Sequence, residues 1–295
     1  MRIIDAHVHL YPLTTSREPV AWAASRGEVH WAQLCTRQRR DGGPVQLFLG
    51  VDDLLREMDA AGVERSVLLG WYWEKPATCA WQNRFYSECV RAHPDRLSAF
   101  ATVHPAAGAE AVAELWRAKG EGLIGLGELS PHSQQVAADD PTWAEILNLA
   151  GELQLPVNLH VTDPASRPYP GRVATPLDDF VALARRFPRT KFILAHWGGG
   201  LAWAPSARDL PNVWFDSAAS PLLYGSEVWR RAVHGAGANR LLFGSDNPLR
   251  LYPQADAGVG LGSLVREASG ALNADELAPV LFENARHLLL TTKGR

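Results

Sequence analysis

A regular alternation between short apolar runs and longer amphipathic segments constrains the fold of this 295-residue chain more than any other feature. Because parallel strands need crossover connections, this alternation predicts parallel strands joined by helices. Eight runs are rich in Ile, Val, Leu or Phe, as buried strands are: Arg2–His9, Arg65–Trp71, Leu97–Val103, Leu123–Leu129, Val157–Val161, Phe192–His196, Val213–Asp216 and Leu241–Gly244. The segments with helical spacing are Asp52–Ala61, Cys79–Ala92, Ala106–Lys119, Trp143–Leu153, Leu177–Phe187, Val228–Gly235 and Asp275–Leu290.

Eight strands of this kind favour a closed (β/α)8 TIM barrel over an open doubly wound sheet, although the open sheet remains an alternative. The motif His-Leu-Tyr-Pro follows the first strand. Because GxGxxG is absent there, a dinucleotide-binding sheet has no support. We therefore predict the α/β class with residues 1–295 forming one barrel domain. Residues 13–50 are the one long departure, and we expect them to form an insertion or lid after strand 1.

Composition narrows the classes of partner. With 46% hydrophobic residues the chain can bury a large core, and a net charge of −3 offers no field to collect nucleic acid or anionic lipid. Three cysteines form no CxxC pair, which argues against a disulfide scaffold. Neither a leader nor a run of roughly 18 apolar residues is visible. We expect a cytoplasmic protein whose partner is a small molecule, with a homodimer as the commonest assembly.

The first strand ends in Asp-Ala-His-Val-His, which places His7 and His9 two residues apart. Alternate residues of a strand face the same side, so both imidazoles are predicted to point into the barrel mouth. Two imidazoles placed this way can chelate one divalent cation. An HxH pair alone is also compatible with two hydrogen-bonded polar residues at a strand end.

Three other strands end in a single polar side chain of the metal-binding type. His160 ends the fifth strand, His196 the sixth and Asp246 follows the eighth. The carboxyl ends of barrel strands form the active-site face. Burying so many polar groups costs free energy unless they are paired or ligated, so we predict a metal site there.

At this point the chain resembles the amidohydrolase superfamily, and within it the amidohydrolase 2 branch. That branch includes predicted metal-dependent hydrolases together with the aminocarboxymuconate-semialdehyde and dihydroxybenzoate decarboxylases. The resemblance spans essentially the whole chain. The motifs that carry it are DAHVH at 5–9, GELSP at 127–131, LPVNLH at 155–160, AHWGGG at 195–200, FDSAASPLLY at 215–224, GSDNP at 244–248 and FENARHLL at 282–289.

The resemblance implies that His7, His9, His160 and Asp246 hold a divalent metal. Zn is the ion expected, with Mn and Fe as alternatives, and a second ion is allowed. His196 would then be an acid/base or substrate-polarising residue, or a ligand of the second metal. Glu128 matches a glutamate that bridges two metals in the TatD-type branch, and it is equally compatible with a carboxylate that orients a ligand histidine.

A carboxylated-lysine centre, which other branches use, is excluded. The lysines of this chain are Lys75, Lys119, Lys191 and Lys293, and none lies near the end of the fourth strand.

This ligand set predicts a metal-dependent hydrolase of an amide, lactone or ester. A cation held by three imidazoles and a carboxylate leaves room for a water of lowered pKa, with Asp246 as general base and His196 as the acid or polarising residue. The alternative is a non-oxidative decarboxylase or hydratase of a small aromatic or unsaturated acid, in which Asp246 or His196 supplies a proton.

The sequence supports three other functional interpretations less well. Dihydroxybenzoate-type decarboxylases often begin with Glu-x-His, which HxH at 7–9 does not match, whereas the aminocarboxymuconate type remains open. A phosphoesterase of the polymerase-and-histidinol-phosphatase type would end on Asp-x-His, which GSDNP lacks. A non-catalytic binding barrel would be expected to lose one or more of the polar strand ends.

Candidate substrate residues lie near the predicted mouth. Aromatic residues there would give a flat wall for a planar substrate, and arginines would bind a carboxylate, although packing and solvation are the commoner roles of each. The candidates are Tyr11, Trp71, Trp73, His104, His132, Arg172, Trp197 and Arg250.

Overall fold

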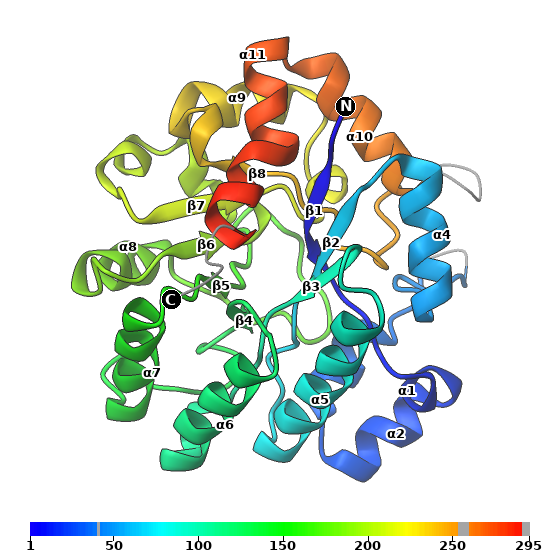
Figure 1. Ribbon diagram of the computed structural model, residues 1–295, viewed down its shortest axis with the longest axis vertical. Helices are drawn as coiled ribbons and strands as arrows, with labels where there is room; N and C mark the ends of the chain where they lie inside the picture. Colours follow the sequence, from blue (N-terminus) through cyan, green and yellow to red (C-terminus); the bar gives the residue numbers. More distant parts are fainter. Residues whose placement is uncertain (40–41, 253–259, 291–295) are drawn as a thin grey trace.

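The computed structural model describes residues 1–39, 42–252 and 260–290. In this part of the chain eight parallel strands form a ring with helices outside it (Figure 1). The strands are β1 (Ile4–Val8), β2 (Arg65–Leu68), β3 (Leu97–Ala99), β4 (Leu126–Leu129), β5 (Val157–Leu159), β6 (Phe192–Leu194), β7 (Val213–Asp216) and β8 (Leu241–Leu242).

The ring is closed by backbone contacts at two seams. Strands β1 to β3 pair in one sheet and β4 to β8 in another, with each strand parallel to its neighbours. Ala101 and Leu126 form a parallel bridge where β3 meets β4, and Val8 and Asn247 form one where β8 meets β1. The predicted (β/α)8 TIM barrel is therefore confirmed.

The outer helices begin and end at residues suited to those positions. Pro76 and Pro141 open two of them, and Gly62 ends another with a φ of +72°. None of the helices in the described ranges has the length and hydropathy to cross a membrane. The helices are α1 (Leu13–Arg17), α2 (Pro19–Arg26), α3 (Val29–Cys35), α4 (Val51–Ala61), α5 (Pro76–Ala92), α6 (Ala109–Gly120), α7 (Pro141–Glu152), α8 (Leu177–Arg186), α9 (Glu227–Ala236), α10 (Leu261–Ala271) and α11 (Ala274–Ala278).

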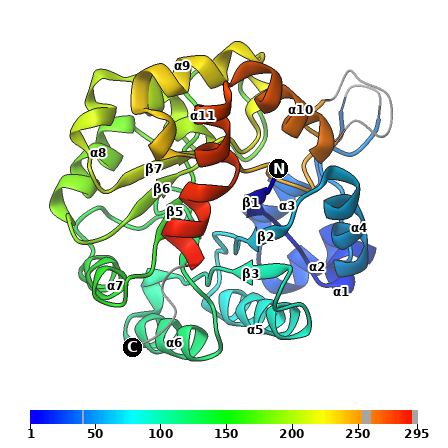
Figure 2. The same cartoon turned by 45° about the horizontal axis from the view of Figure 1, so that its top comes forward.

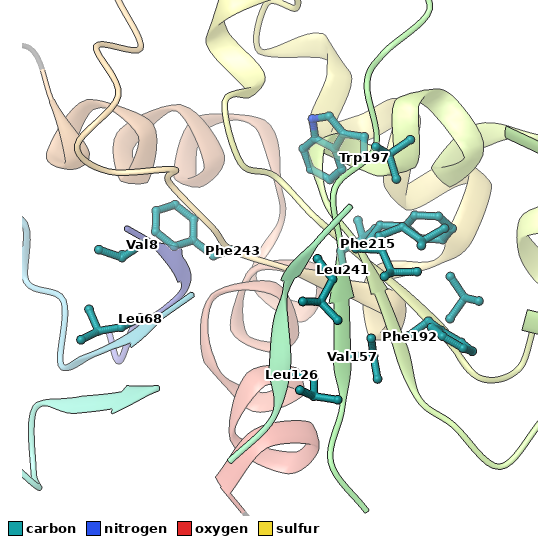
Figure 3. Close-up of a cluster of buried hydrophobic side chains, with 14 of the residues drawn as sticks. Val8, Leu68, Leu126, Val157, Phe192, Trp197, Phe215, Leu241 and Phe243 are labelled. Carbon is teal, nitrogen blue, oxygen red and sulfur yellow. The ribbon is translucent and has the colours of Figure 1, made fainter. Parts of the chain in front are cut away.

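The hydrophobic core has two main parts. The larger part packs strand residues such as Val157, Phe192 and Phe215 against the helices (Figure 3). The second part joins apolar residues of β1, β2, β6 and β8 to Phe282 and Leu289 of the C-terminal segment. Turning the molecule shows this segment lying across one end of the ring (Figures 1 and 2). One end of the barrel is thus filled by apolar side chains.

All eight predicted strands are present, but most are shorter at their carboxyl ends. The first was predicted to run to His9 and the sixth to His196, whereas the observed strands end at Val8 and Leu194. The backbone leaves the extended conformation here, and His196 has a φ of +57°. If β6 continued as a strand, alternation would direct His196 away from the barrel mouth. The change of backbone conformation after β6 therefore helps to form the site.

Two predicted helices differ from the structure. The segment Asp275–Leu290 is not one α-helix: α11 is followed by π-helical turns at Pro279–Glu283 and Arg286–Leu290. Pro279 lacks the N–H that would continue α11. The segment Ala106–Lys119 is interrupted at Gly108, whose φ of +58° separates a short 3₁₀ turn from α6.

Other helices were not predicted. Helix α10 contains two glycines, which weaken a helical pattern. Residues 13–35 form α1, α2 and α3, of which α1 and α2 lie at the rim between α4 and α5 (Figures 1 and 2). Trp31 of α3 packs in an aromatic cluster with Tyr11, Trp71 and Trp73. The segment is therefore anchored to the residues that follow β1 and β2.

Close packing at Gly125 gives a test of the barrel seam. A Cβ at this position would lie 2.5 Å from the ring of Phe100. We expect Gly125→Ala to lower the free energy of unfolding by about 1–3 kcal/mol through overpacking, measured by urea denaturation. Gly120→Ala is the control, because open space surrounds a Cβ there. Equal stability of the two variants would contradict the packing at this seam.

Candidate metal centre

Six side chains of the metal-binding type meet at the carboxyl edge of the barrel. They come from the ends of five strands and form two groups of three, in each of which the candidate ligand atoms lie within 4.8 Å of one another. The first group is His7, His9 and Asp246, and the second is Glu128, His160 and His196. All five histidine and aspartate positions that the sequence singled out are brought together, with Glu128 beside them.

The first group has the spacing of ligands on one ion. The Nε2 atoms of His7 and His9 lie 3.2 Å apart. The Oδ1 atom of Asp246 lies 3.8 Å from Nε2 of His7 and 3.5 Å from Nε2 of His9. Two nitrogens bound to one tetrahedral zinc would be separated by about 3.3 Å. The three atoms thus fit one face of a small cation.

The second group centres on Glu128, which is buried at the end of β4. Its Oε1 lies 2.9 Å from Nδ1 of His160 and 3.6 Å from Nε2 of His196, whereas its Oε2 lies 3.6 Å from Nε2 of His9. The two carboxylate oxygens therefore face different groups. This is the arrangement of a carboxylate able to connect two neighbouring cation positions.

Hydrogen bonds on the outer side of each ring determine which nitrogen faces inward. Nδ1 of His7 donates to Oδ2 of Asp216 over 2.9 Å. Nδ1 of His9 donates to the carbonyl of Leu69, and Nδ1 of His196 donates to the carbonyl of Ala218. In the neutral form of each ring, this leaves Nε2 without a proton and free to bind a metal.

Charge in the cluster also fits a cation. Burial alone would lower the pKa of His7, but Asp216, Glu128 and Asp246 outweigh it and raise that pKa to about 10. Burial raises the pKa of Asp246 to about 6. Three carboxylates enclosed with four imidazoles need positive charge to offset their desolvation. A divalent ion would supply it, so the donor set fits a metal.

The motif AHWGGG produces a tight left-handed turn after β6. Trp197, Gly198, Gly199 and Gly200 all have positive φ values, between 57° and 102°. A Cβ at Gly198 would lie 2.9 Å from the ring of Phe215. Only glycine fits such a conformation at such a close approach. The turn places His196 at the centre.

A cavity of about 650 Å³ opens above the metal-binding side chains. His9, Glu128, His160, His196 and Asp246 form its floor, and His7 is buried beneath them. Its walls come from Leu34, Cys35, Arg37 and Gln46 of the predicted insertion and from the loops that follow β2, β5, β6 and β7. The candidate ligands therefore face a space large enough for a small organic molecule.

The structure brings only some predicted substrate residues to this cavity. Trp71 and Trp197 line it. The remaining six lie outside the lining: Tyr11 and Trp73 are buried in the aromatic cluster, His104 accepts from the N–H of Ala106, His132 pairs with Asp179, Arg172 donates to Ser166, and the backbone of Arg250 bonds Val45.

Sequence reasoning missed several wall residues and one carboxylate. Tyr72, Tyr169, Tyr224 and Arg37 line the cavity, and Asp216 supports His7. Asp216 ends β7 just as His160 and His196 follow their strands, so the same rule would have found it. The wall residues come from loops, where the sequence carries no comparable periodic signal.

A model of the amidohydrolase family, amidohydrolase 2, matches residues 4–290. The chain belongs to the amidohydrolase family. Members of this family are metal-dependent enzymes that include decarboxylases and a hydratase. The predicted family is therefore confirmed, and so is the prediction of a metal-dependent enzyme. A comparison with curated proteins finds no match.

Solved structures support the fold assigned to this amidohydrolase-family protein. It is 19% identical to 5-carboxyvanillate decarboxylase from Sphingomonas paucimobilis, over 98% of both chains with a TM-score of 0.72. It is 18% identical to 2,6-dihydroxybenzoate decarboxylase from Rhizobium, over 98% of both chains with a TM-score of 0.68. For 4-oxalomesaconate hydratase from Rhodopseudomonas palustris the identity is 19%, the coverage 97% and 95%, and the TM-score 0.66.

Asp216 provides a test of the metal centre. We expect Asp216→Asn to weaken metal affinity by about 10- to 100-fold, because His7 loses the carboxylate that orients its ring. Metal affinity would be measured by competition with a chelator on the apoprotein, and folding by circular dichroism. Asp139→Asn, an exposed change, is the control. An unchanged affinity in Asp216→Asn would show that this carboxylate does not orient a ligand.

Proposed function

We propose that this protein is a metal-dependent decarboxylase of a small, flat carboxylic acid that carries an aromatic or unsaturated system. One observation carries the proposal: an aromatic-walled cavity has a floor of side chains of the metal-binding type and, on its wall, an arginine that no carboxylate of the described residues pairs with. A decarboxylase needs these parts together, since it must hold a carboxylate, pack a flat carbon frame and deliver one proton.

The aromatic wall suits a planar substrate. Trp71 and Tyr72 stack with ring centroids 4.4 Å apart and planes 25° from parallel. Trp197 and Tyr169 add further aromatic surface to the lining. Aromatic faces pack closely on another flat ring, and they exclude water from it. Removal of water from a reacting carboxylate favours the loss of neutral CO2.

Arg37 supplies a cation on the same wall. Its Nε donates to the carbonyl of Leu34, and its guanidinium lies 4.5 Å from the ring centroid of Tyr169. Within the described residues no carboxylate pairs with it, and it lines the cavity. We propose that its remaining N–H groups bind a ligand there. An arginine held in this way is suited to bidentate binding of a carboxylate.

For the metal we propose zinc, with Mn and Fe as the alternatives, because imidazole and carboxylate ligands suit all three. His7, His9 and Asp246 would hold the first ion, and Glu128, His160 and His196 would take up a second. The bound ion supplies a Lewis acid that orients and polarises the oxygens of the substrate.

The remaining chemistry falls to the side chains. As the bond to the carboxyl carbon breaks, its electron pair stays on the substrate carbon, and CO2 leaves. Asp246 gives that carbon the proton that replaces CO2. His196 lies beside this carboxyl group, with its Nδ1 4.0 Å from Oδ2 of Asp246. The solved structures with similar folds named above include two decarboxylases, which supports this chemistry.

Hydrolysis of an amide, lactone or ester is the second candidate, and the position of Glu128 favours it. A carboxylate between two groups of ligands is typical of two-metal hydrolytic sites. Asp246 would then accept a proton from the attacking water, and His196 would polarise the carbonyl. Both candidates take a small molecule as partner.

Isotope labelling separates the two reactions. Metal-loaded protein in D₂O is given 2,6-dihydroxybenzoate, 5-carboxyvanillate, and a set of lactones and amides. Decarboxylation releases CO2 and leaves one deuterium on carbon, whereas hydrolysis in H₂¹⁸O places ¹⁸O in the product. We expect deuterium on carbon. A product that carries ¹⁸O from water and no deuterium on carbon would contradict decarboxylation and favour hydrolysis.

Asp246→Asn should abolish turnover, because its amide has no acidic proton for carbon. The loss should exceed about 10³-fold, measured as CO2 release at saturating metal with metal content determined for both proteins. Retained turnover would remove Asp246 from the proton-transfer role.

Arg37→Gln should raise KM for carboxylate substrates by about 10- to 100-fold, because a charged hydrogen bond contributes about 1.5–3 kcal/mol. Initial rates over a range of substrate concentrations measure this. Arg17→Gln, an exposed change on α1, is the matched control. Equal KM values for the two variants would exclude Arg37 from substrate binding.

A further inference from the structure

The candidate ligand Asp246 has a backbone conformation that few residues with a side chain adopt. Its φ is +64°, in the left-handed region that favours glycine, and its N–H donates to the carbonyl of His7 over 2.9 Å. A residue with a side chain stays in this region only where its surroundings hold it there. The position of the Asp246 carboxylate therefore depends on what holds the residues on either side of it.

The residue before Asp246 is fixed to β1. The backbone N–H of Ser245 donates to Oδ1 of Asp5 over 2.9 Å, and the hydroxyl of Ser245 donates to Oδ2 of Asp5 over 2.5 Å. Oγ of Ser245 also accepts the backbone N–H of Asn247 over 3.0 Å. Both Asp5 and Ser245 are buried. The strand that carries His7 and precedes His9 thus holds one side of the turn.

The residue after Asp246 is held by an outer helix as well as by β1. The carbonyl of Asn247 accepts the N–H of His9 over 2.7 Å. The side-chain Nδ2 of Asn247 donates to Oε2 of Glu57 over 2.7 Å, although the two residues lie 190 positions apart. Glu57 belongs to α4. Because the acceptor is a carboxylate, this hydrogen bond is charge-assisted and stronger than one between neutral groups.

Loss of the Glu57 carboxylate would leave the amide of Asn247 without this acceptor. Asn247 is only 8% exposed, and a buried amide without a partner costs free energy. Backbone pairing of residues 248–250 with the insertion fixes the main chain beyond the turn, not this amide. As the amide turns towards another acceptor, the adjacent Asp246 moves with it. Its Oδ1 lies 3.5 Å from Nε2 of His9, so even a small movement changes the spacing of two candidate ligand atoms.

We propose that Glu57 is a positioning residue that acts through Asn247 to hold the carboxylate of Asp246 at the candidate metal centre. The inference rests on the proposed function in taking Asp246 as a metal ligand and proton donor. It extends the site to a side chain of the outer helices. Glu57 is not among the described residues that line the cavity, so its effect passes through other residues and not through contact with a substrate.

Bound cobalt provides a spectroscopic test that needs no turnover. The visible absorption of bound Co²⁺ depends on the number and arrangement of its ligands. Glu57→Ala should change the Co²⁺ spectrum in the same bands as Asp246→Asn, and it should weaken Co²⁺ affinity by about 10-fold. Glu57→Gln keeps an oxygen acceptor for Asn247. It should restore the spectrum of the unmodified protein, with an affinity within about threefold of it.

A double-mutant cycle tests the route through Asn247. If Glu57 acts on Asp246 through the side chain of Asn247, Glu57→Ala should have no further effect on the Co²⁺ spectrum or affinity in an Asn247→Ala protein. Asp52→Ala is the matched control, because it removes an exposed carboxylate from the same helix. It should leave both measurements unchanged. Urea denaturation of each variant shows that it is folded when the spectrum is recorded.

Several results would overturn the proposal. These are an unchanged spectrum in Glu57→Ala, a change that Glu57→Gln shares, and an effect of Glu57→Ala that persists in the Asn247→Ala protein. An unchanged spectrum in Asp246→Asn would reject Asp246 as a ligand and the role of Glu57 with it. If Glu57→Ala does not fold, the same change of spectrum is expected of Asn247→Ala, which removes the other end of the hydrogen bond.

Release of CO2 separates this inference from the proposed function. If the unmodified protein decarboxylates an acid, Glu57→Ala at saturating metal should lower kcat by about 10-fold and leave KM within about twofold. An unchanged Co²⁺ spectrum in Glu57→Ala would overturn the role of Glu57 and leave decarboxylation standing. A change of spectrum shared by Glu57→Ala and Asp246→Asn, with no CO2 released from any acid, would support Glu57 and reject decarboxylation.

Discussion

The carboxylate of Asp216 is the point on which the arrangement of the site depends. It accepts hydrogen bonds from the side chains of His7 and Asn158 and from the backbone N–H groups of His196 and Ala218. These groups belong to β1, to β5 and to the segments that follow β6 and β7. One buried anion thus connects strands far apart in sequence, and it orients the ring of the candidate ligand His7 on β1.

Much of the barrel and its polar floor could be predicted from the sequence, because both depend on patterns within short segments. Short apolar runs that alternate with segments of helical spacing predict parallel strands joined by helices, and parallel strands bring their carboxyl ends together. His7, His160 and Asp246 were found because each stands at such an end. The carboxyl limits of the strands were placed too far, since the backbone turns where the polar side chains begin.

The residues of the cavity walls could not be predicted from the sequence in the same way. Trp73 and Tyr72 are neighbours in sequence and share one buried aromatic cluster, yet of the two only Tyr72 lines the cavity. Which of the two faces inward depends on how α3 packs across the loop after β2. That packing joins segments more than 30 residues apart, and no periodic pattern records it. For the same reason Arg37, which follows α3, was passed over in favour of Arg172 and Arg250.

The apolar C-terminal segment that fills one end of the barrel has a consequence for synthesis. Ile4 and Val67 share a buried cluster with Phe282 and Leu289. During translation at about 5–20 residues per second, the first strands wait on the order of tens of seconds for these partners. A nascent chain therefore exposes apolar strand surface for most of its emergence from the ribosome, and holding that surface away from other chains is a task for the chaperones of its cell.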